Sequence, residues 1–434
     1  MVDASWMMRH DGGIDWTVEP ANHGQFRQLH ERMKYIIILG DGMSDYPIAR
    51  LGGKTPLQVA RKPNMDRIAR EGRCGLFKTI EEDMPTGSEA ANLSVMGYDP
   101  RQVLQGRGVL EAASMGVDIR DDDMAMRCNL ICLFDDGRIK NHSAGHISSE
   151  ESDEILKTLQ KEIGATGLNF YTGVSYRHLF VGKGLDPRLD CAPPHDHPNE
   201  PAEGLLIRAK VPEAQKTADL LNNLIRRSWP ILKDHPVNQR RRAAGKDPGN
   251  SIWFWSPGKR PKMWTFQERF GVKGAVISAV DLIRGIGVYA GLEVLKVPGA
   301  TGLFDTNYEG KADACLAALE HCDFCYVHVE GPDEAGHEGN VDLKIRTIED
   351  LDARLIDRIL KGLDQQKMEA VVALLPDHPT PVEKRVHVRD AVPFAIRGPR
   401  HKADKVERYD EQSCAAGGFG TVHGDEFIRA VFQK

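Results

Sequence analysis

The sequence has few long apolar runs and little clustered positive charge. No window of its 434 residues approaches the roughly 20 apolar residues that a membrane-spanning helix needs. The formal net charge is −6, and the basic run at 240–246 is typical of a solvated loop rather than of a patch that binds phosphate backbones. We therefore expect neither a membrane nor a nucleic acid as a partner.

Cysteine is scarce, with eight residues scattered along the chain. Cys322 and Cys325 form a C-x-x-C motif, but they lie in the strand-like run HCDFCYVHVEG. We interpret them as buried thiols rather than as a metal or redox pair. This cysteine usage is typical of a reducing compartment, so we expect a cytoplasmic protein.

Strand-like and helix-like segments alternate over much of the chain. Continuous apolar runs of strand length predict buried strands at 35–39, 274–280, 324–331, 370–378 and 392–398. Helical spacing is present at 341–361 and again at 55–72, where Thr55 and Pro63 are start signals and Gly72 is a stop signal. This alternation predicts an α/β core with a mostly parallel sheet covered by helices on both faces.

The length, with 28% charged and 41% hydrophobic residues, predicts two or three domains. Residues 1–32 are polar and show no strand or helix period, so we expect a peripheral N-terminal appendage. Residues 105–261 are loop-rich, and 124–141 predicts two strands around a turn. We therefore expect a smaller α+β domain inserted between two parts of the core, 33–104 and 262–434.

Two short clusters carry the residue types that bind divalent metals. Asp333 and His337 stand four residues apart, so a helix after Pro332 would place both on one face. Asp377 and His378 end a predicted buried strand, at the sheet edge where open α/β folds bind ligands. Each cluster is too small to close a site alone, and together they predict a two-metal centre that clamps phosphoryl oxygens.

Further candidates lie close to the ends of predicted core strands or beyond them. Asp41 follows the first strand, His387 lies in KRVHVRDAVPFAI, and Ser88 lies in the small-residue loop MPTGSEAAN. A serine at a helix N-terminus could attack a phosphate there. Taken singly, Asp41 is a turn residue, His387 a loop histidine and Ser88 an N-cap. His423 in TVHGDEF is interpreted as a loop residue without a role in the site.

Taken in order, these motifs resemble the archaeal-type branch of cofactor-independent (2,3-bisphosphoglycerate-independent) phosphoglycerate mutase, in the alkaline phosphatase superfamily. The resemblance covers most of residues 33–434. It rests on the motifs ILGDGMSDYP, GGKTPLQVARKPNMDRIAREG, MPTGSEAANLSVMGYDP, GRGVLEA, GPDEAGHEGN, DHPTP and VHVRDAVP.

The resemblance implies an alkaline-phosphatase-like three-layer core and an isomerase that interconverts 3-phosphoglycerate and 2-phosphoglycerate. Ser88 would be the transiently phosphorylated nucleophile. One divalent metal would be held by Asp41, Ser88, Asp377 and His378, and the other by Asp333, His337 and His387. Manganese is the expected ion, with zinc, cobalt and magnesium as alternatives. The partner is a small phosphorylated substrate, phosphoglycerate, and the oligomeric state stays open.

Phosphate and carboxylate recognition would need cations and hydrogen-bond donors, chiefly from the inserted domain. The candidates are Arg107, Arg127, Asn129, His146, Arg177 and Arg284. The arginine fork suits both anions, although for each arginine alone a structural salt bridge is equally expected. Trp253 and Trp255 are interpreted as packing residues of the inserted domain.

Other activities share the same metal chemistry. The segments NSIWFWSPGKRPKM and PPHDHPNEP resemble a bacterial subgroup proposed to phosphorylate homoserine, which implies a homoserine kinase-like phosphotransferase as an alternative. The missing G-x-x-x-x-G-K-[ST] loop counts against a kinase, although ATP can bind without one. A metal-dependent phosphatase and an inactive metal-binding homologue are the remaining alternatives.

Overall fold

The computed structural model describes residues 33–104 and 106–433, so the predicted appendage at 1–32 lies outside the described residues. The chain divides into two compact units. The first unit contains the described residues up to Val103, together with Met263–Ile283 and the residues from Ala290 onward. The second contains Leu104–Lys262 and also Arg284–Tyr289, which the sequence analysis assigned to the core.

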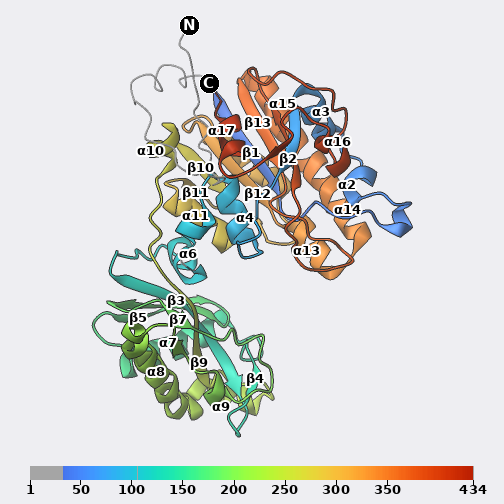
Figure 1. Cartoon of the computed structure of the whole chain (residues 1–434). Coiled ribbons are helices and arrows are strands. Elements are labelled where there is room, and N and C mark those ends of the chain that lie inside the picture. The colour runs from blue at the N-terminus through green and yellow to red at the C-terminus, as the bar shows by residue number, and fades with distance from the viewer. Residues whose placement is uncertain (1–32, 105, 434) are drawn as a thin grey trace. The chain divides into compact units, whose positions relative to one another are not determined.

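An eight-stranded sheet forms the centre of the first unit (Figure 1). Its order is β11-β10-β12-β1-β13-β14-β2-β15. The strands are β1 (Lys34–Gly40), β2 (Arg73–Phe77), β10 (Gly274–Ile277), β11 (Glu293–Leu295), β12 (Phe324–Val329), β13 (Ala370–Leu375), β14 (Val392–Arg397) and β15 (Thr421–Val422). All neighbours pair in parallel except β14, which is antiparallel to both β13 and β2. The mostly parallel sheet is therefore confirmed.

Helices cover both faces of this sheet. The helices of this unit are α2 (Pro56–Val59), α3 (Pro63–Glu71), α4 (Ser88–Val95), α5 (Pro100–Val103), α10 (Phe266–Phe270), α12 (Tyr308–Ala318), α13 (Gly331–Glu338), α14 (Val341–Asp350), α15 (Asp357–Gln366), α16 (Glu411–Ala415) and α17 (Glu426–Val431), with the short turn η1 (Ala49–Leu51) and the π-helical segment η4 (Leu351–Ile356). Helix α11 (Asp281–Tyr289) contributes residues to both units.

Alternate side chains of β1 enter two separate apolar layers, as the pleat of a strand requires. Ile36 and Ile38 are fully buried in one cluster with residues of α3, α12 and α15. On the other face, the Tyr35 ring lies 4.7 Å from that of Phe432, which directly follows α17. A strand buried on both faces explains the uninterrupted apolar run in the sequence.

Two predicted helices are interrupted. The helical spacing at 55–72 forms α2 and α3, because Ala60 leaves the helical conformation with ψ of 140° and Pro63 starts a new helix. The pattern at 341–361 forms α14, the π-helical segment η4 and α15. Three predicted strands also end two or three residues early, so their last polar residues belong to loops.

The second unit contains an antiparallel sheet. Its order is β4-β3-β6-β5, with β9 also paired to β3. Its strands are β3 (Asp123–Leu133), β4 (Ile139–Asn141), β5 (Leu168–Val174), β6 (Arg177–Lys183) and β9 (Ser251–Lys259), beside the small pair β7 (Leu189–Asp190) and β8 (Arg208–Ala209). Its helices are α6 (Arg107–Ser114), α7 (Ser149–Glu162), α8 (Gln215–Lys233) and α9 (Pro236–Ala243), with short turns η2 (Ala202–Leu205) and η3 (Pro212–Ala214).

The core of the second unit includes Trp253 and Trp255, which confirms their packing role. Within the part of the chain that the structure describes, no helix combines the length and apolar character needed to cross a bilayer.

Candidate metal centre

The predicted metal ligands lie where three adjacent central strands end. Asp41 follows β1, Asp333 lies on α13 just after β12, and Asp377 and His378 follow β13. Because β12, β1 and β13 are neighbours and parallel, their carboxyl ends meet at one edge of the sheet. Residues separated by more than 300 positions are thereby brought together.

The first group of ligands consists of Asp333, His337 and His387. The His337 Nε2 lies 2.8 Å from His387 Nε2 and 3.2 Å from an Asp333 carboxylate oxygen. The Nδ1 of His337 lies 3.0 Å from the carbonyl oxygen of Arg385, and a hydrogen bond to it orients the ring with Nε2 toward the cluster. The hydrogen bond with Asp333 raises the pKa of His337 to about 9. Two imidazoles and one carboxylate therefore converge on one point.

The second group consists of Asp41, Asp377, His378 and Ser88. The His378 Nε2 lies 3.6 Å from Asp41, 3.4 Å from Asp377 and 3.1 Å from the Ser88 hydroxyl. Burial, together with the neighbouring charge of Asp377, raises the pKa of Asp41 well above its usual value. Burial also lowers the pKa of His378.

The two groups adjoin one another. The rings of His378 and His387 stack with centroids 3.9 Å apart. One ligand atom from each of Asp41, Asp333 and His378 also lies within 4.8 Å of the others. All seven predicted ligands therefore belong to one continuous cluster, as a two-metal centre requires.

Three buried carboxylates contribute to this cluster. Asp41 and Asp377 are fully buried and Asp333 is nearly so. One carboxylate oxygen of Asp41 is buried without any hydrogen-bond partner. Buried carboxylates need a partner or a metal, so the residues present fit divalent cations.

Ser88 does not cap its helix. The N-cap of α4 is Gly87, and Ser88 is the first residue of the helix. The interpretation of Ser88 as an N-cap is therefore wrong. Its hydroxyl instead faces His378, next to the backbone N–H groups of the helix start, which favour anions.

Several polar residues of the site escaped the sequence analysis. His328, the last residue but one of β12, lies 2.9 Å from the second carboxylate oxygen of Asp41. The Asn92 amide donates to Asp377 at 2.8 Å and to the carbonyl of Ser88 at 2.9 Å. Tyr326 in turn donates to Asn92 at 2.6 Å. The available signals were a histidine inside an apolar strand, and an asparagine one helical turn after Ser88.

Burial and acidic neighbours also shift the pKa values of residues around Asp41. Burial lowers the pKa of His328 to about 3, so this histidine is neutral. Burial and Asp333 raise the pKa of Glu330 to about 8. One ligand atom from each of Asp41, His328 and Glu330 lies within 4.8 Å of the others. His328 and Glu330 thus extend the cluster around Asp41.

A tight turn brings β1 into the site. Gly42 has φ of +59°, and a Cβ there would lie 2.5 Å from an Asp333 oxygen. Its N–H donates to Asp377 at 3.2 Å. Only glycine permits both the backbone conformation and this close approach.

In the second unit, the predicted substrate-binding arginines influence one another. The Arg127 guanidinium lies 4.3 Å from the ring centroid of Trp255 and 3.1 Å from Glu111. Burial, and the nearby charges of Arg107 and Arg177, oppose the charged form and lower the pKa of Arg127, although Glu111 acts in the other direction. Arg107 and Arg177 therefore lie near enough to Arg127 for their charges to act on it.

The remaining predicted substrate residues have varied environments. The side-chain amide oxygen of Asn129 accepts a hydrogen bond from the Trp255 indole at 3.2 Å. His146 is exposed in a loop with φ of 51°, and Arg284 lies on α11 in its second-unit part. The Nδ1 of His423 lies 2.9 Å from a Glu81 carboxylate oxygen, and His423 belongs to none of the candidate metal-binding groups among the described residues.

Comparison with known proteins gives a consistent family. Residues 69–238 match the family described as 2,3-bisphosphoglycerate-independent phosphoglycerate mutase. The protein of that name from Methanosarcina barkeri is 49% identical over 91% of this chain and 98% of its own length. A probable enzyme of the same name from Geobacter sulfurreducens is 48% identical over 93% of this chain and 100% of its own length.

Solved structures give the same picture. A protein from Pyrococcus horikoshii superposes with a TM-score of 0.78 at 31% identity, covering 92% of this chain and 97% of that one. The cofactor-independent phosphoglycerate mutase from Thermoplasma acidophilum superposes with a TM-score of 0.68 at 29% identity, covering 92% of this chain and 99% of that one.

Proposed function

We propose that this chain, which belongs to the 2,3-bisphosphoglycerate-independent phosphoglycerate mutase family, interconverts 3-phosphoglycerate and 2-phosphoglycerate. One observation carries the proposal. The Ser88 hydroxyl lies at a helix start, 3.1 Å from His378, inside a cluster of buried carboxylates and imidazoles. Such a serine is placed to accept and return a phosphoryl group.

Two divalent cations fit the cluster. Asp41, Ser88, Asp377 and His378 would hold one, and Asp333, His337 and His387 the other. Oxygen and imidazole donors without a thiol suit manganese, with zinc, cobalt and magnesium as alternatives. When bound, the cations supply charge that polarises the phosphoryl oxygens and favours the serine alkoxide.

The transfer requires two displacements at phosphorus. Ser88 loses its hydroxyl proton and its oxygen attacks in line. The bond from phosphorus to the glycerate oxygen breaks, and that oxygen takes up a proton as phosphoserine forms. The other glycerate hydroxyl then loses its proton and attacks phosphoserine, which returns Ser88 to its starting state. Asn92 fixes the geometry, because its amide holds both the Ser88 backbone and Asp377.

Anion recognition is assigned to the second unit, which we interpret as the substrate-binding domain. Arg107, Arg127 and Arg177 provide grouped guanidinium forks that suit carboxylate and phosphate. We also assign Asn129, His146 and Arg284 to substrate binding. A cytoplasmic location is proposed on the grounds that all eight cysteines are free thiols.

The decisive experiment offers 3-phosphoglycerate as the sole phosphate source, without ATP or 2,3-bisphosphoglycerate. Conversion to 2-phosphoglycerate is expected, with a trapped phosphopeptide containing Ser88. Ser88→Ala should abolish both. Ser94→Ala is the matched control, since Ser94 lies on the same helix and its hydroxyl only donates to the carbonyl of Ala90 at 3.1 Å. Activity in Ser88→Ala would exclude the covalent route.

A second assay offers homoserine and ATP. Formation of O-phosphohomoserine without conversion of 3-phosphoglycerate would establish the kinase-like alternative. Release of inorganic phosphate alone would establish a phosphatase.

A further inference from the structure

A group of metal-binding side chains lies away from the candidate metal centre. Glu293 is the first residue of edge strand β11, and His321 and Cys322 form the turn before β12. Strand β10 separates β11 from β12, and all three strands are parallel. These three residues therefore lie at the amino ends of their strands, whereas the candidate metal centre lies at the carboxyl ends.

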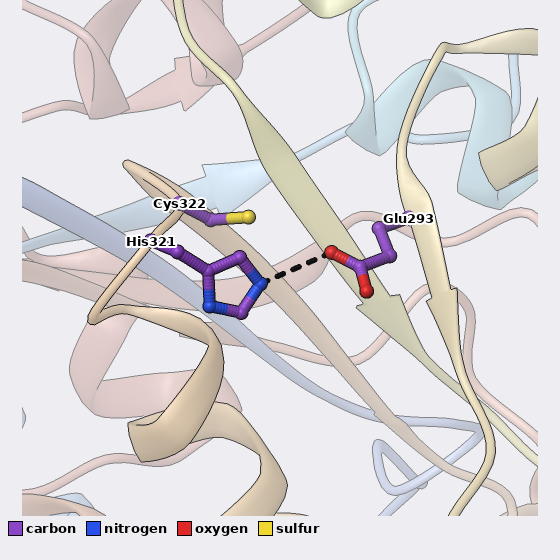
Figure 2. Close-up of side chains that lie close together, drawn as sticks. All are labelled: Glu293, His321 and Cys322. Atoms are coloured by element: carbon purple, nitrogen blue, oxygen red, sulfur yellow. Dashed lines mark hydrogen bonds and ion pairs between the residues drawn. The ribbon is translucent and has the colours of Figure 1, made fainter.

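The three side chains point into one small volume. Figure 2 shows the carboxylate of Glu293, the imidazole of His321 and the sulfur of Cys322 converging. One ligand atom of each lies within 4.8 Å of the other two. The Nε2 of His321 is 3.1 Å from a Glu293 oxygen. Ligands about 2.0–2.1 Å from a tetrahedral zinc ion are roughly 3.3 Å apart, so this pair needs almost no movement.

Burial differs among the three ligands in a way that suits a cation entering from solvent. Cys322 is 3% exposed, whereas the side chains of His321 and Glu293 are 56% and 52% exposed. The turn is held by backbone hydrogen bonds from His321 and Cys322 to Ala318, at 3.1 Å and 2.8 Å. The carbonyl of Cys322 also accepts a hydrogen bond from Lys34 at 2.8 Å. The sulfur is therefore fixed at the base of the group.

The C-x-x-C motif divides between two environments. Cys325 is fully buried and interacts with Cys315. Cys322 instead faces Glu293. Burial raises the pKa of the Cys322 thiol, and the negative charge of Glu293 raises it further. Both cysteines are buried, as the sequence predicts. Among the candidate metal-binding groups of the described residues, Cys322 lies together with an imidazole and a carboxylate, whereas Cys325 belongs to none of these groups.

We propose that Glu293, His321 and Cys322 form a binding site for a borderline divalent cation of the zinc class, with water completing its coordination. Thiolate and imidazole donors together select zinc, cobalt or cadmium over manganese and magnesium. The bound ion ties the edge strand β11 to the turn before β12 and stabilises this side of the sheet. The role of this ion is structural, because the ion lies at the amino ends of the parallel strands whereas Ser88 lies at their carboxyl ends.

The test uses Co²⁺ as the probe, added to the full-length chain after chelation. A thiolate bound to Co²⁺ gives a sulfur-to-metal charge-transfer band in the near ultraviolet. The candidate metal centre contains no cysteine, so cobalt bound there does not contribute to this band. We expect the band to saturate at about one thiolate-bound ion per chain, because the proposed ligand set contains one thiol, Cys322.

Three variants and one control decide the outcome. Cys322→Ser should abolish the band. His321→Ala and Glu293→Gln should each weaken Co²⁺ binding by more than about ten-fold, because loss of a residue that merely hydrogen-bonds to a metal ligand already lowers metal affinity by about that factor. Cys191→Ser is the control, because Cys191 is partly exposed and lies in the second unit. It should leave the band unchanged.

Absence of the band in the unmodified chain would overturn the proposal, and so would its persistence in Cys322→Ser. A band that needs Cys322 but does not change in His321→Ala or in Glu293→Gln would show that Cys322 binds Co²⁺ without the other two residues. That result would also overturn the proposal. His321 and Glu293 are exposed, so their variants decide the question even if Cys322→Ser fails to fold.

Discussion

Lys344 is a buried residue whose removal should disturb the loops of the candidate metal centre. It lies on α14 and is fully buried. Its ammonium donates to the Asp45 carboxylate at 2.8 Å, the Ser44 carbonyl at 3.0 Å and the Thr380 carbonyl at 2.7 Å. It thus joins the loop after Asp41 to the loop after His378.

The cost of Lys344→Met follows from what the substitution leaves behind. Burial lowers the pKa of Lys344, and the charge of Asp45 opposes that effect. Methionine fills a similar volume but removes all three donors. Asp45 keeps hydrogen bonds from the N–H groups of Val382 at 3.1 Å and Tyr46 at 2.7 Å, but its charge is no longer paired. Breaking a buried ion pair in this way costs about 3–5 kcal/mol.

The measurement is urea unfolding of the metal-free protein followed by circular dichroism. Lys361→Met is the matched control, because the side chain of Lys361 is 69% exposed and forms an i, i+4 pair with Asp357. That pair contributes at most about 0.5 kcal/mol. Lys344→Met should also weaken Mn²⁺ binding, whereas Lys361→Met should not. A difference in unfolding free energy below about 1 kcal/mol between the two variants would refute the argument, since buried pairs cost more.

Three further predictions test the metal centre, the arginine group and a buried histidine. Equilibration with Mn²⁺ should leave about two ions per chain, and His337→Ala should lose at least one of them with most of the activity; unchanged metal content by elemental analysis would contradict the assignment. Arg127→Lys should lower kcat/KM at least about ten-fold, because the flat contact with Trp255 and the fork are lost; unaltered steady-state kinetics would exclude Arg127 from substrate binding. Burial lowers the pKa of His178 in the folded chain to about 3. Below the pKa of about 6.5 that this histidine has in the unfolded chain, only the unfolded chain binds a proton there, so stability falls as the pH falls. Thermal and urea unfolding of the parent and His178→Asn should show the parent losing about 2 kcal/mol relative to the variant between pH 7.5 and pH 5; a gap that does not change with pH would show that His178 is not buried in neutral form.

The central strands were predictable because each is buried on both faces. The apolar runs of β1, β12 and β13 have no solvent side, so their sequences are continuous rather than alternating. The positions of the predicted ligands followed from the same fact, since the residues that follow neighbouring parallel strands, such as Asp41 and Asp377, lie at one edge of the sheet. The antiparallel direction of β14 was not predictable, because an apolar run carries no information about direction.

Helix interruptions and unit membership depend on contacts that the sequence pattern does not encode. Helical spacing continues through η4, whose π-helical turns keep Leu351 and Leu355 in the core. Likewise Arg284–Tyr289 joins the second unit, where a Cβ at Gly285 would lie 2.0 Å from the carbonyl oxygen of Leu110. Such close approach between segments far apart in the chain appears only in three dimensions.

The residues that the sequence analysis missed share one physical property: they hold the predicted metal ligands in place, directly or through one further side chain. His328 holds Asp41, Asn92 holds Asp377 and the Ser88 backbone, and Tyr326 holds Asn92. Each is polar among apolar neighbours, and a buried polar group must find a partner. A search for isolated polar residues inside predicted buried strands would therefore have found His328 and Tyr326, whose partners include the Asp41 carboxylate and the Asn92 amide.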